Sequence, residues 1–238
     1  MIAAAELMAV VLSRELRDGE TAIMGAVSAL PLAACRVAQL THAPDLWFIT
    51  GGSGAVNAHP RHLPESSCDQ QLLAAETSLP LPEIVLLEGR GDVVDVFFAG
   101  GLQIDARGNC NLVAVGDWTR PRLRGPGGVG LSFLPRAGRA VIYTTSHTPR
   151  TFVEEVDFVS GPGLTAALVV TPLCTFGFHR RTERMRLRTV HRGVTVEQVR
   201  AATGFEVAAP DPVPQTPDPT PEEVAALSRV DPLGVLRA

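Results

Sequence analysis

Two short apolar runs, each followed directly by glycine, lie on either side of a helical pattern in the first part of the sequence, and this arrangement limits the possible folds. Residues 21–24 form one such strand pattern, and residues 45–50 form a second that runs into Gly51. Between them, residues 32–40 have the three- and four-residue spacing of a helix. Apolar runs of this kind that alternate with helices are typical of a parallel sheet covered on both sides. The sequence therefore predicts an α/β fold, an open, mainly parallel sheet with helices on both faces.

The same patterns continue along the chain. Further strands are expected at residues 95–99, 111–115, 140–144 and 167–170, and helices at residues 5–16 and after the capping residues Thr148, Thr195 and Thr220. Residues 58–90 have the composition of a loop with one short helical stretch near residues 72–75. We predict an α/β domain over residues 1–206, followed by a proline-rich connector and a C-terminal helix (residues 207–238) that packs on the same domain.

The net charge of the chain limits the classes of partner that it can bind. The chain has 21 basic and 25 acidic residues, a net charge of −4, which argues against nucleic acid or an anionic membrane as the main partner. Every basic residue is arginine, so a Schiff-base lysine is excluded.

The sequence also lacks the signals of export, of a metal centre and of a membrane span. Its four cysteines are single and widely spaced, which indicates reduced thiols and no metal site. The first twenty residues lack the basic start and cleavage site of a signal peptide. The longest uncharged run, residues 158–178, is interrupted by glycine and proline. We expect a cytoplasmic protein.

Two glycine-rich turns are candidate ligand sites. Residues 51–54 (GGSG) follow a predicted parallel strand, where open α/β sheets place their ligands. Residues 125–128 (GPGG) could direct backbone N–H groups at one oxygen, as an oxyanion hole requires. Each turn taken alone is equally consistent with a plain connection, and neither matches a P-loop or a dinucleotide-binding fingerprint.

Clusters of arginine and single histidines are weaker candidates. Arg120, Arg122 and Arg124 precede the second glycine turn, and six arginines crowd residues 180–192. Either cluster could contact phosphates, although most such runs are solvated surfaces. His59, His62 and His147 could exchange protons near neutral pH, but a single histidine is more often structural.

Three strings form an ordered series of motifs. Residues 100–111 (GGLQIDARGNCN), Gly116 and Asp117, and residues 125–128 (GPGG) match G-[GA]-x-Q-[IV]-D-x-x-G-N-x-N, G-D and G-x-G-G. Together they resemble the beta subunits of class I coenzyme A-transferases, and the glutaconate CoA-transferase branch in particular. The likeness continues in order through residues 156–159, 193–195, 203–205 and 231–232. The resemblance implies an open α/β subunit that pairs with a homologous alpha subunit. It also implies an acyl-CoA site, with coenzyme A as part of the substrate and no permanently bound cofactor.

One residue departs from the family pattern. In these transferases, a glutamate in an E-[SN]-G motif attacks the acyl-CoA and becomes a glutamyl-CoA thioester. Residues 49–54 match that motif, and Gly52 stands at the position of the glutamate. Glycine has no side chain to acylate, and Ser53 has no adjacent base, because the next histidine is His59. A covalent exchange route is therefore not expected from this chain.

The remainder of the family's site is retained, and backbone donors can still polarise a thioester carbonyl. We expect catalytic contributions from Gly52, Ser53, Gly54, Gly127 and Gly128, and substrate contacts from Gly100, Gly101, Gln103, Asn109 and His59. A proton donor or base would come from His59, His62, Glu65 or Asp69, or from the partner chain.

Three functions are consistent with these residues. The first is the beta subunit of a heteromeric enzyme that acts on an acyl-CoA thioester by decarboxylation or by hydrolysis, such as hydrolytic opening of a β-keto ring, through a stabilised enolate, as members of this superfamily without the glutamate do. The second is true CoA transfer that uses another carboxylate, such as Glu65 or one from the partner. The third is a non-catalytic subunit that binds and stabilises an active alpha chain.

Overall fold

The structure is a computed structural model of the 238-residue chain, and it describes residues 2–25, 29–64, 66, 69–128, 130–179 and 183–237. Two units make up the chain. Unit 1 comprises Met1–Phe98, Arg136–Gly138 and Asp218–Ala238, and unit 2 comprises Ala99–Pro135 and Arg139–Pro217. The division of the chain at residue 206 stays a prediction.

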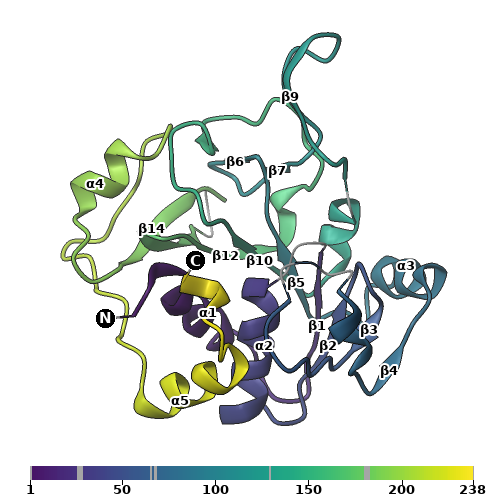
Figure 1. The fold of residues 1–238 in the computed structure, drawn as a ribbon. Helices are drawn as coiled ribbons and strands as arrows, with labels where there is room; N and C mark the ends of the chain where they lie inside the picture. The colour runs from purple at the N-terminus through teal and green to yellow at the C-terminus, as the bar shows by residue number, and fades with distance from the viewer. Residues whose placement is uncertain are drawn as a thin grey trace. The chain divides into compact units, whose positions relative to one another are not determined.

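Unit 1 contains the predicted β-α-β arrangement (Figure 1). Its strands run in the order β5-β1-β2-β3-β4, with β1 parallel to β2 and β5, and β3 antiparallel to both β2 and β4. The strands are β1 (Thr21–Met24), β2 (Trp47–Thr50), β3 (Ala55–Val56), β4 (Thr77–Ser78) and β5 (Val96–Ala99). The helices are α1 (Ala4–Ser13), α2 (Ala29–Thr41), η1 (Gln70–Leu73), α3 (Leu81–Gly89), α5 (Pro221–Val230) and η4 (Val235–Arg237).

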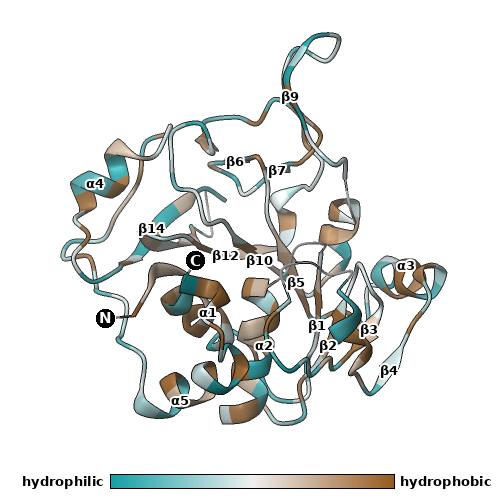
Figure 2. Cartoon of the chain, in the orientation of Figure 1, coloured by the Kyte–Doolittle hydropathy of each residue, from teal (hydrophilic) through white to brown (hydrophobic). Residues whose placement is uncertain are grey.

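The core of unit 1 lies between the parallel strands and α1 and α2. Ile23, Phe48 and Val96 on the strands and Met8 and Val37 on the helices are completely buried. The strands and α1 are accordingly brown in Figure 2. Because β1 is apolar on both faces, it occupies the middle of this strand group.

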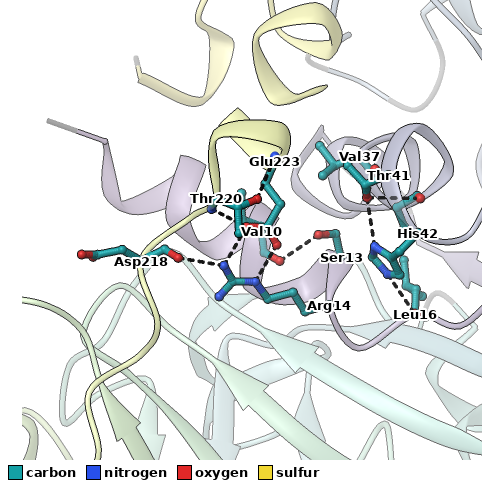
Figure 3. A network of polar contacts seen from close by, with 11 residues as sticks. Val10, Ser13, Arg14, Leu16, Val37, Thr41, His42, Asp218, Thr220 and Glu223 are labelled. Atoms are coloured by element: carbon teal, nitrogen blue, oxygen red, sulfur yellow. Dashed lines mark hydrogen bonds and ion pairs between the residues drawn. The ribbon is translucent and has the colours of Figure 1, made fainter. Parts of the chain in front are cut away.

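The C-terminal helix α5 is fixed to α1 by an ion pair (Figure 3). Arg14 donates from Nε to Oε1 of Glu223 at 2.6 Å and from Nη2 to Oε2 at 2.7 Å. Arg14 Nη2 also donates to the carbonyl of Asp218 at 3.0 Å. Thr220 and Glu223 form the predicted capping box at the start of the helix.

Unit 2 has strands in the order β14-β13-β12-β10, with β10 parallel to β12 and the others antiparallel. A smaller sheet has the order β11-β6-β7, and β8 and β9 form a hairpin. The strands are β6 (Gln103–Asp105), β7 (Cys110–Asn111), β8 (Ala114–Gly116), β9 (Pro121–Arg124), β10 (Arg139–Tyr143), β11 (Phe152–Val153), β12 (Ala166–Val170), β13 (Cys174–Phe178) and β14 (Met185–Val190). The short helices are η2 (Leu131–Arg136), η3 (Gly163–Thr165) and α4 (Val196–Ala201).

The expected α/β architecture with mainly parallel central strands is confirmed, but three local predictions are wrong. The strand expected at residues 111–115 is two short strands of different sheets, β7 and β8, because the Asn111 side chain accepts the N–H of Val113 and turns the chain between them. The helix expected after Thr148 is a turn that leads into β11, because Phe152 pairs with Ile104 of β6. Sheet pairing here overrides the capping signal. Residues 58–90 contain the nine-residue helix α3, which the sequence did not reveal because its Leu81 and Leu86 are exposed and obscure the amphipathic pattern.

Candidate active site

The turn over residues 51–54 joins β2 to β3 in unit 1. The N–H of Gly54 donates to the carbonyl of Thr50 at 2.7 Å, and the N–H of Gly51 donates to the carbonyl of Met24 at 2.8 Å. A Cβ atom on Gly54, whose φ is +72°, would lie 2.0 Å from the carbonyl oxygen of Leu79. The turn therefore requires glycine at its end for both conformation and space.

Gly52 and Ser53 lie at the open side of this turn. Gly52 is exposed, and its backbone groups form no hydrogen bond with another described residue. The Ser53 hydroxyl is 2.6 Å from Oγ1 of Thr50, and it contacts no carboxylate or imidazole among the described residues. A serine without such a base is a weak nucleophile, so this part of the turn offers backbone amides instead of an activated side chain.

His59 does not lie beside the turn. The chain reverses after Gly54, so Ile49 pairs with Val56 and the N–H of Asn57 donates to the carbonyl of Phe48. This register carries His59 toward the start of β2, whereas Gly52 follows its end. A strand rises roughly 3.3 Å per residue, which separates the two positions by about the length of β2. The imidazole instead lines a small cavity with Arg36 and Arg229.

His62, Glu65 and Asp69 were the other candidates for proton transfer. None of them is found beside this turn in the described structure. His62 and Asp69 line a cavity of about 350 Å³ together with Leu233 and Val235. Asp69 caps η1 by accepting the N–H of Gln71 at 2.9 Å. Glu65 lies outside the described residues.

Gln103, which is buried, is the centre of a hydrogen-bond network in unit 2 that extends to the exposed Asp157. Its Oε1 accepts Nδ2 of Asn111 at 2.7 Å and the N–H of Asp157 at 3.1 Å, while its Nε2 donates to Oδ2 of Asp157 at 3.2 Å. The same Asp157 oxygen accepts the N–H of Gly116 at 2.6 Å. The network therefore joins β6, β7 and the first strand of the β8–β9 hairpin.

Asn109 is held in a second network built on Asp105. The Asp105 carboxylate is 2% exposed and accepts the backbone N–H of Asn109 at 3.0 Å and its Nδ2 at 2.9 Å. Oδ1 of Asn109 accepts the N–H of Gly163 at 2.9 Å. Gly100 and Gly101 are close-approach positions, because a Cβ atom there would lie 3.1 Å from the carbonyl of Tyr143 and 2.6 Å from that of Gln103.

Sequence reasoning identified the segment that contains these residues but not the acidic side chains that organise it. Asp105 and Asp157 each lie in a string that carries the family resemblance, and no functional role was expected of either. The spacing D-x-x-G-N was the available signal, since an aspartate followed by a glycine turn commonly accepts backbone N–H groups.

Gly127 and Gly128 have open space where a side chain would lie. A Cβ atom added to either residue would meet nothing within 4 Å. The N–H of Gly127 donates to the carbonyl of Leu112 at 3.3 Å, whereas the N–H of Gly128 has no acceptor among the described residues. The next residue, Val129, lies outside the described residues. Among the described residues, the N–H of Gly128 is therefore an unused donor.

The arginines that precede this turn lie on the exposed β8–β9 hairpin, whose tip is hydrophilic in Figure 2. Arg124 lies 4.8 Å from the ring centroid of Trp118, and this ring contacts Phe158 edge-on at 5.4 Å. In the second arginine cluster, Arg184 pairs with Glu154 at 2.7 Å. Arg180 and Arg181 lie outside the described residues.

His147 is part of the interior of unit 2. Its Nδ1 is 2.9 Å from Oγ1 of Thr171, and its Nε2 is 3.0 Å from Oγ1 of Thr203. Burial lowers its pKa to about 4. A ring that is neutral and bonded at both nitrogens at physiological pH is a structural histidine.

The described cysteines are buried and free, and burial raises the pKa of the thiols of Cys110 and Cys174 to about 12. Such thiols are poor nucleophiles. Cys68 lies outside the described residues.

No group of three or more His, Cys, Asp or Glu residues in the described ranges could hold a metal ion. The helices of the described residues are all too short or too polar to cross a bilayer.

Comparison with known proteins gives consistent matches. The family model described as Coenzyme A transferase matches residues 5–202. The B-type subunit of the 3-oxoadipate CoA-transferase of Pseudomonas knackmussii is 31% identical over 242 aligned residues, covering 95% of this chain and 92% of that protein. The cholesterol ring-cleaving hydrolase IpdB subunit of Mycobacterium tuberculosis is 31% identical over 246 aligned residues, covering 95% and 93%. Among solved structures, the decarboxylase AibA/AibB has a TM-score of 0.90 at 27% identity, covering 100% of this chain and 98% of that one.

Proposed function

The chain belongs to the coenzyme A transferase family, and from this premise we propose that it is the B-type subunit of a heteromeric enzyme that decarboxylates or hydrolyses an acyl-CoA thioester. The substrate would carry the coenzyme A, so no permanently bound cofactor is required. A homologous alpha subunit would complete the enzyme, as the names of the AibA/AibB decarboxylase and the IpdB subunit imply for those proteins.

The proposal rests on Gly52, a residue without a side chain that is exposed in the turn after β2. We propose that Gly52 replaces the glutamate that becomes acylated in CoA transferases. Two further features of the turn support this. The Ser53 hydroxyl is bonded to Thr50 and not to a base. None of the described carboxylates hydrogen-bonds to residues 51–54.

The chemistry would then depend on electrostatic stabilisation by the main chain. In decarboxylation, the C–C bond to the departing CO₂ would break. In hydrolytic opening of a β-keto ring, water would add to the ring ketone, and the C–C bond between that carbon and the α-carbon of the thioester would then break. Each step leaves its electron pair on the thioester as an enolate, with negative charge on the thioester oxygen. The unused N–H of Gly128 can donate to that oxygen as its charge develops. One such donor contributes roughly 10²–10³ in kcat in other enzymes. The proton that quenches the enolate would come from the partner or from water.

Among the residues predicted to bind substrate, Gln103 and Asn109 would act by positioning. Their side chains are occupied by Asp157 and Asp105, so we propose that they shape the segment before the Gly128 turn and do not contact the acyl group. Gly100 and Gly101 would serve the same purpose, because their missing side chains allow the backbone to pack closely.

True CoA transfer is the second candidate, and the similarity to the 3-oxoadipate CoA-transferase of Pseudomonas knackmussii favours it. This route requires a carboxylate that forms the acyl-enzyme. Glu65 or an acidic residue of the partner would have to supply it.

The discriminating experiment uses the chain co-expressed with its A-type partner. Candidate acyl-CoA esters are supplied with and without a labelled carboxylate acceptor. Release of CO₂ or of a ring-opened CoA ester without the acceptor supports the proposal. Strict dependence on the acceptor, with CoA appearing on it, supports transfer.

A non-catalytic role is tested by Gly128→Leu, which fills the open space at the unused N–H. Gly177→Leu is the matched control, because it also places a side chain in open space, at a position on β13. If the assembled complex keeps its full rate with Gly128→Leu, this chain is a scaffold.

A further inference from the structure

A small polar cavity in unit 1 brings together positive side chains that the proposed function does not use. Its volume is about 100 Å³, and it is lined by Arg36, Leu40, His59, Pro60, Leu63, Arg229 and Val230. These residues come from α2, from the loop after β3 and from the last turn of α5. The volume has room for roughly three water molecules, or for one tetrahedral oxyanion.

The two arginines of this cavity repel each other. Arg36 is half-buried, and both burial and the charge of Arg229 lower its pKa. Its Nη1 donates to Oε1 of Gln39 at 2.6 Å. The carboxylate of Glu76 is near enough to favour the charged form of Arg36, but within the described residues neither arginine forms an ion pair.

His59 adds a third polar side chain to the cavity. Its Nδ1 is 3.3 Å from the carbonyl of Asn57, and its Nε2 forms no hydrogen bond with another described residue. Two guanidinium groups and an imidazole therefore share one cavity whose lining includes no carboxylate.

The position of Arg229 is imposed by the rest of α5. The N-terminal end of the helix is fixed by the Arg14–Glu223 pair (Figure 3), and its C-terminal end is followed by Asp231, which accepts the N–H groups of Val235 and Leu236. A cation in the last turn complements the helix dipole, which accounts for Arg229 alone. The dipole does not account for Arg36 on the facing helix α2.

We propose that this cavity is a binding site for a phosphate-type anion, held between Arg36 and Arg229 beside the imidazole of His59. Guanidinium groups bind phosphate oxygens through paired N–H donors, and an anion between them would convert their repulsion into attraction. Binding would join the C-terminal end of α5 to α2, as Glu223 joins its N-terminal end to α1. The site lies apart from the turn that contains Gly52, so the proposal is independent of the catalytic one.

The test titrates inorganic phosphate into the full-length chain in complex with its partner, at constant ionic strength maintained with chloride. Calorimetry and the melting temperature are recorded for the wild type and for Arg36→Gln, Arg229→Gln and Arg61→Gln. Arg61 is exposed on the same loop as His59 and does not line the cavity, so its variant is the control of equal charge. We expect saturable binding that is weakened at least tenfold by the first two variants and unchanged by the third.

Competition identifies the source of the phosphate group. Displacement of inorganic phosphate by coenzyme A and not by dephospho-coenzyme A assigns the site to the 3′-phosphate of the substrate. Binding without displacement by either assigns it to the free ion. Arg229 is exposed, so Arg229→Gln remains informative if Arg36→Gln does not fold. The proposal is overturned if phosphate has no effect beyond that of chloride, or if Arg229→Gln binds phosphate as well as Arg61→Gln does.

Discussion

Gln103 is bonded to Asp157 through both ends of its side-chain amide: Nε2 donates to Oδ2 at 3.2 Å, and Oε1 accepts the backbone N–H at 3.1 Å. The two residues are 54 positions apart in the sequence. Gln103 is 4% exposed, so little of its amide remains available to a ligand. The family motif around Gln103 is thereby explained as the framework of the segment that carries the Gly128 turn.

Gln103→Ala should therefore lower the stability of the chain. It removes one of the two acceptors of the buried Asn111 Nδ2, which keeps the carbonyl of Ala114, and it removes the acceptor of the Asp157 N–H. We expect a loss of about 2 kcal/mol in the free energy of unfolding. Denaturant titration measures it, and Gln70→Ala, at an exposed position in η1, is the control. A raised KM with unchanged stability would instead assign Gln103 to substrate binding.

The glycines of the turn after β2 should differ sharply in tolerance. Gly54→Ala places a methyl group 2.0 Å from the carbonyl of Leu79 at a φ of +72°, and we expect a loss of at least about 3 kcal/mol in unfolding free energy. Gly52→Ala adds its methyl group at an exposed position and should change stability by less than about 1 kcal/mol. Equal effects of the two substitutions in thermal melts would contradict the described turn.

The free energy of unfolding of unit 2 should decrease as the pH is lowered, and the lowered pKa of His147 should cause part of this decrease. Burial lowers the pKa of His147 from its ordinary value of 6.5 to about 4. Between these values the unfolded chain binds a proton that the folded chain does not, so the stabilisation is complete above pH 6.5 and is lost as the pH falls to about 4.

His147→Gln removes this titration and should flatten the dependence of unfolding free energy on pH in that range. The control is His42→Gln, which removes a histidine of unit 1 that contacts Leu16 instead of the Thr171 and Thr203 hydroxyls. An unchanged slope in His147→Gln would show that His147 titrates normally in the folded protein.

The contact between α5 and α1 should be sensitive to the charge of Glu223. Burial would raise the pKa of this carboxyl, but the hydrogen bonds from Arg14 and Thr220 hold it below its ordinary value. Glu223→Gln should lower the free energy of unfolding by about 1–2 kcal/mol, because a charge-assisted bidentate pair is replaced by a neutral one.

Glu222→Gln is the matched control, since Glu222 occupies the same first turn and is exposed. Hydrogen exchange of the α5 amides should accelerate in Glu223→Gln only. Equal protection in both variants would mean that apolar packing alone holds the helix.

The sequence predicted the fold where local pattern and tertiary environment agree. The strand at residues 21–24 and the helices capped by Thr195 and Thr220 have clear signals and were confirmed. The signal at Thr148 was equally clear, but pairing of Phe152 with a distant strand decided the conformation. Helix α3 was missed because its apolar residues do not form one buried stripe.

The candidate site was predictable only in part for a similar reason. The family motif located the glycine turns, since glycine is required there by backbone geometry that the sequence records directly. It did not indicate that Asp157 and Asp105 occupy the side chains of Gln103 and Asn109. The position of His59 depends on the register between β2 and β3, which no single-chain pattern specifies.

The central claim is that this chain forms no acyl-enzyme, and mass spectrometry of the assembled complex quenched during turnover tests it most directly. Borohydride would reduce any glutamyl-CoA thioester to an alcohol, and hydroxylamine would convert it to a hydroxamate, in each case with release of CoA. Gly52→Glu provides the positive control at the position of the missing nucleophile. We expect product formation by the wild-type complex with every carboxylate of this chain unmodified, and an alcohol or hydroxamate at a glutamate only in Gly52→Glu. Either modification of a carboxylate of the wild-type chain during turnover would contradict the account.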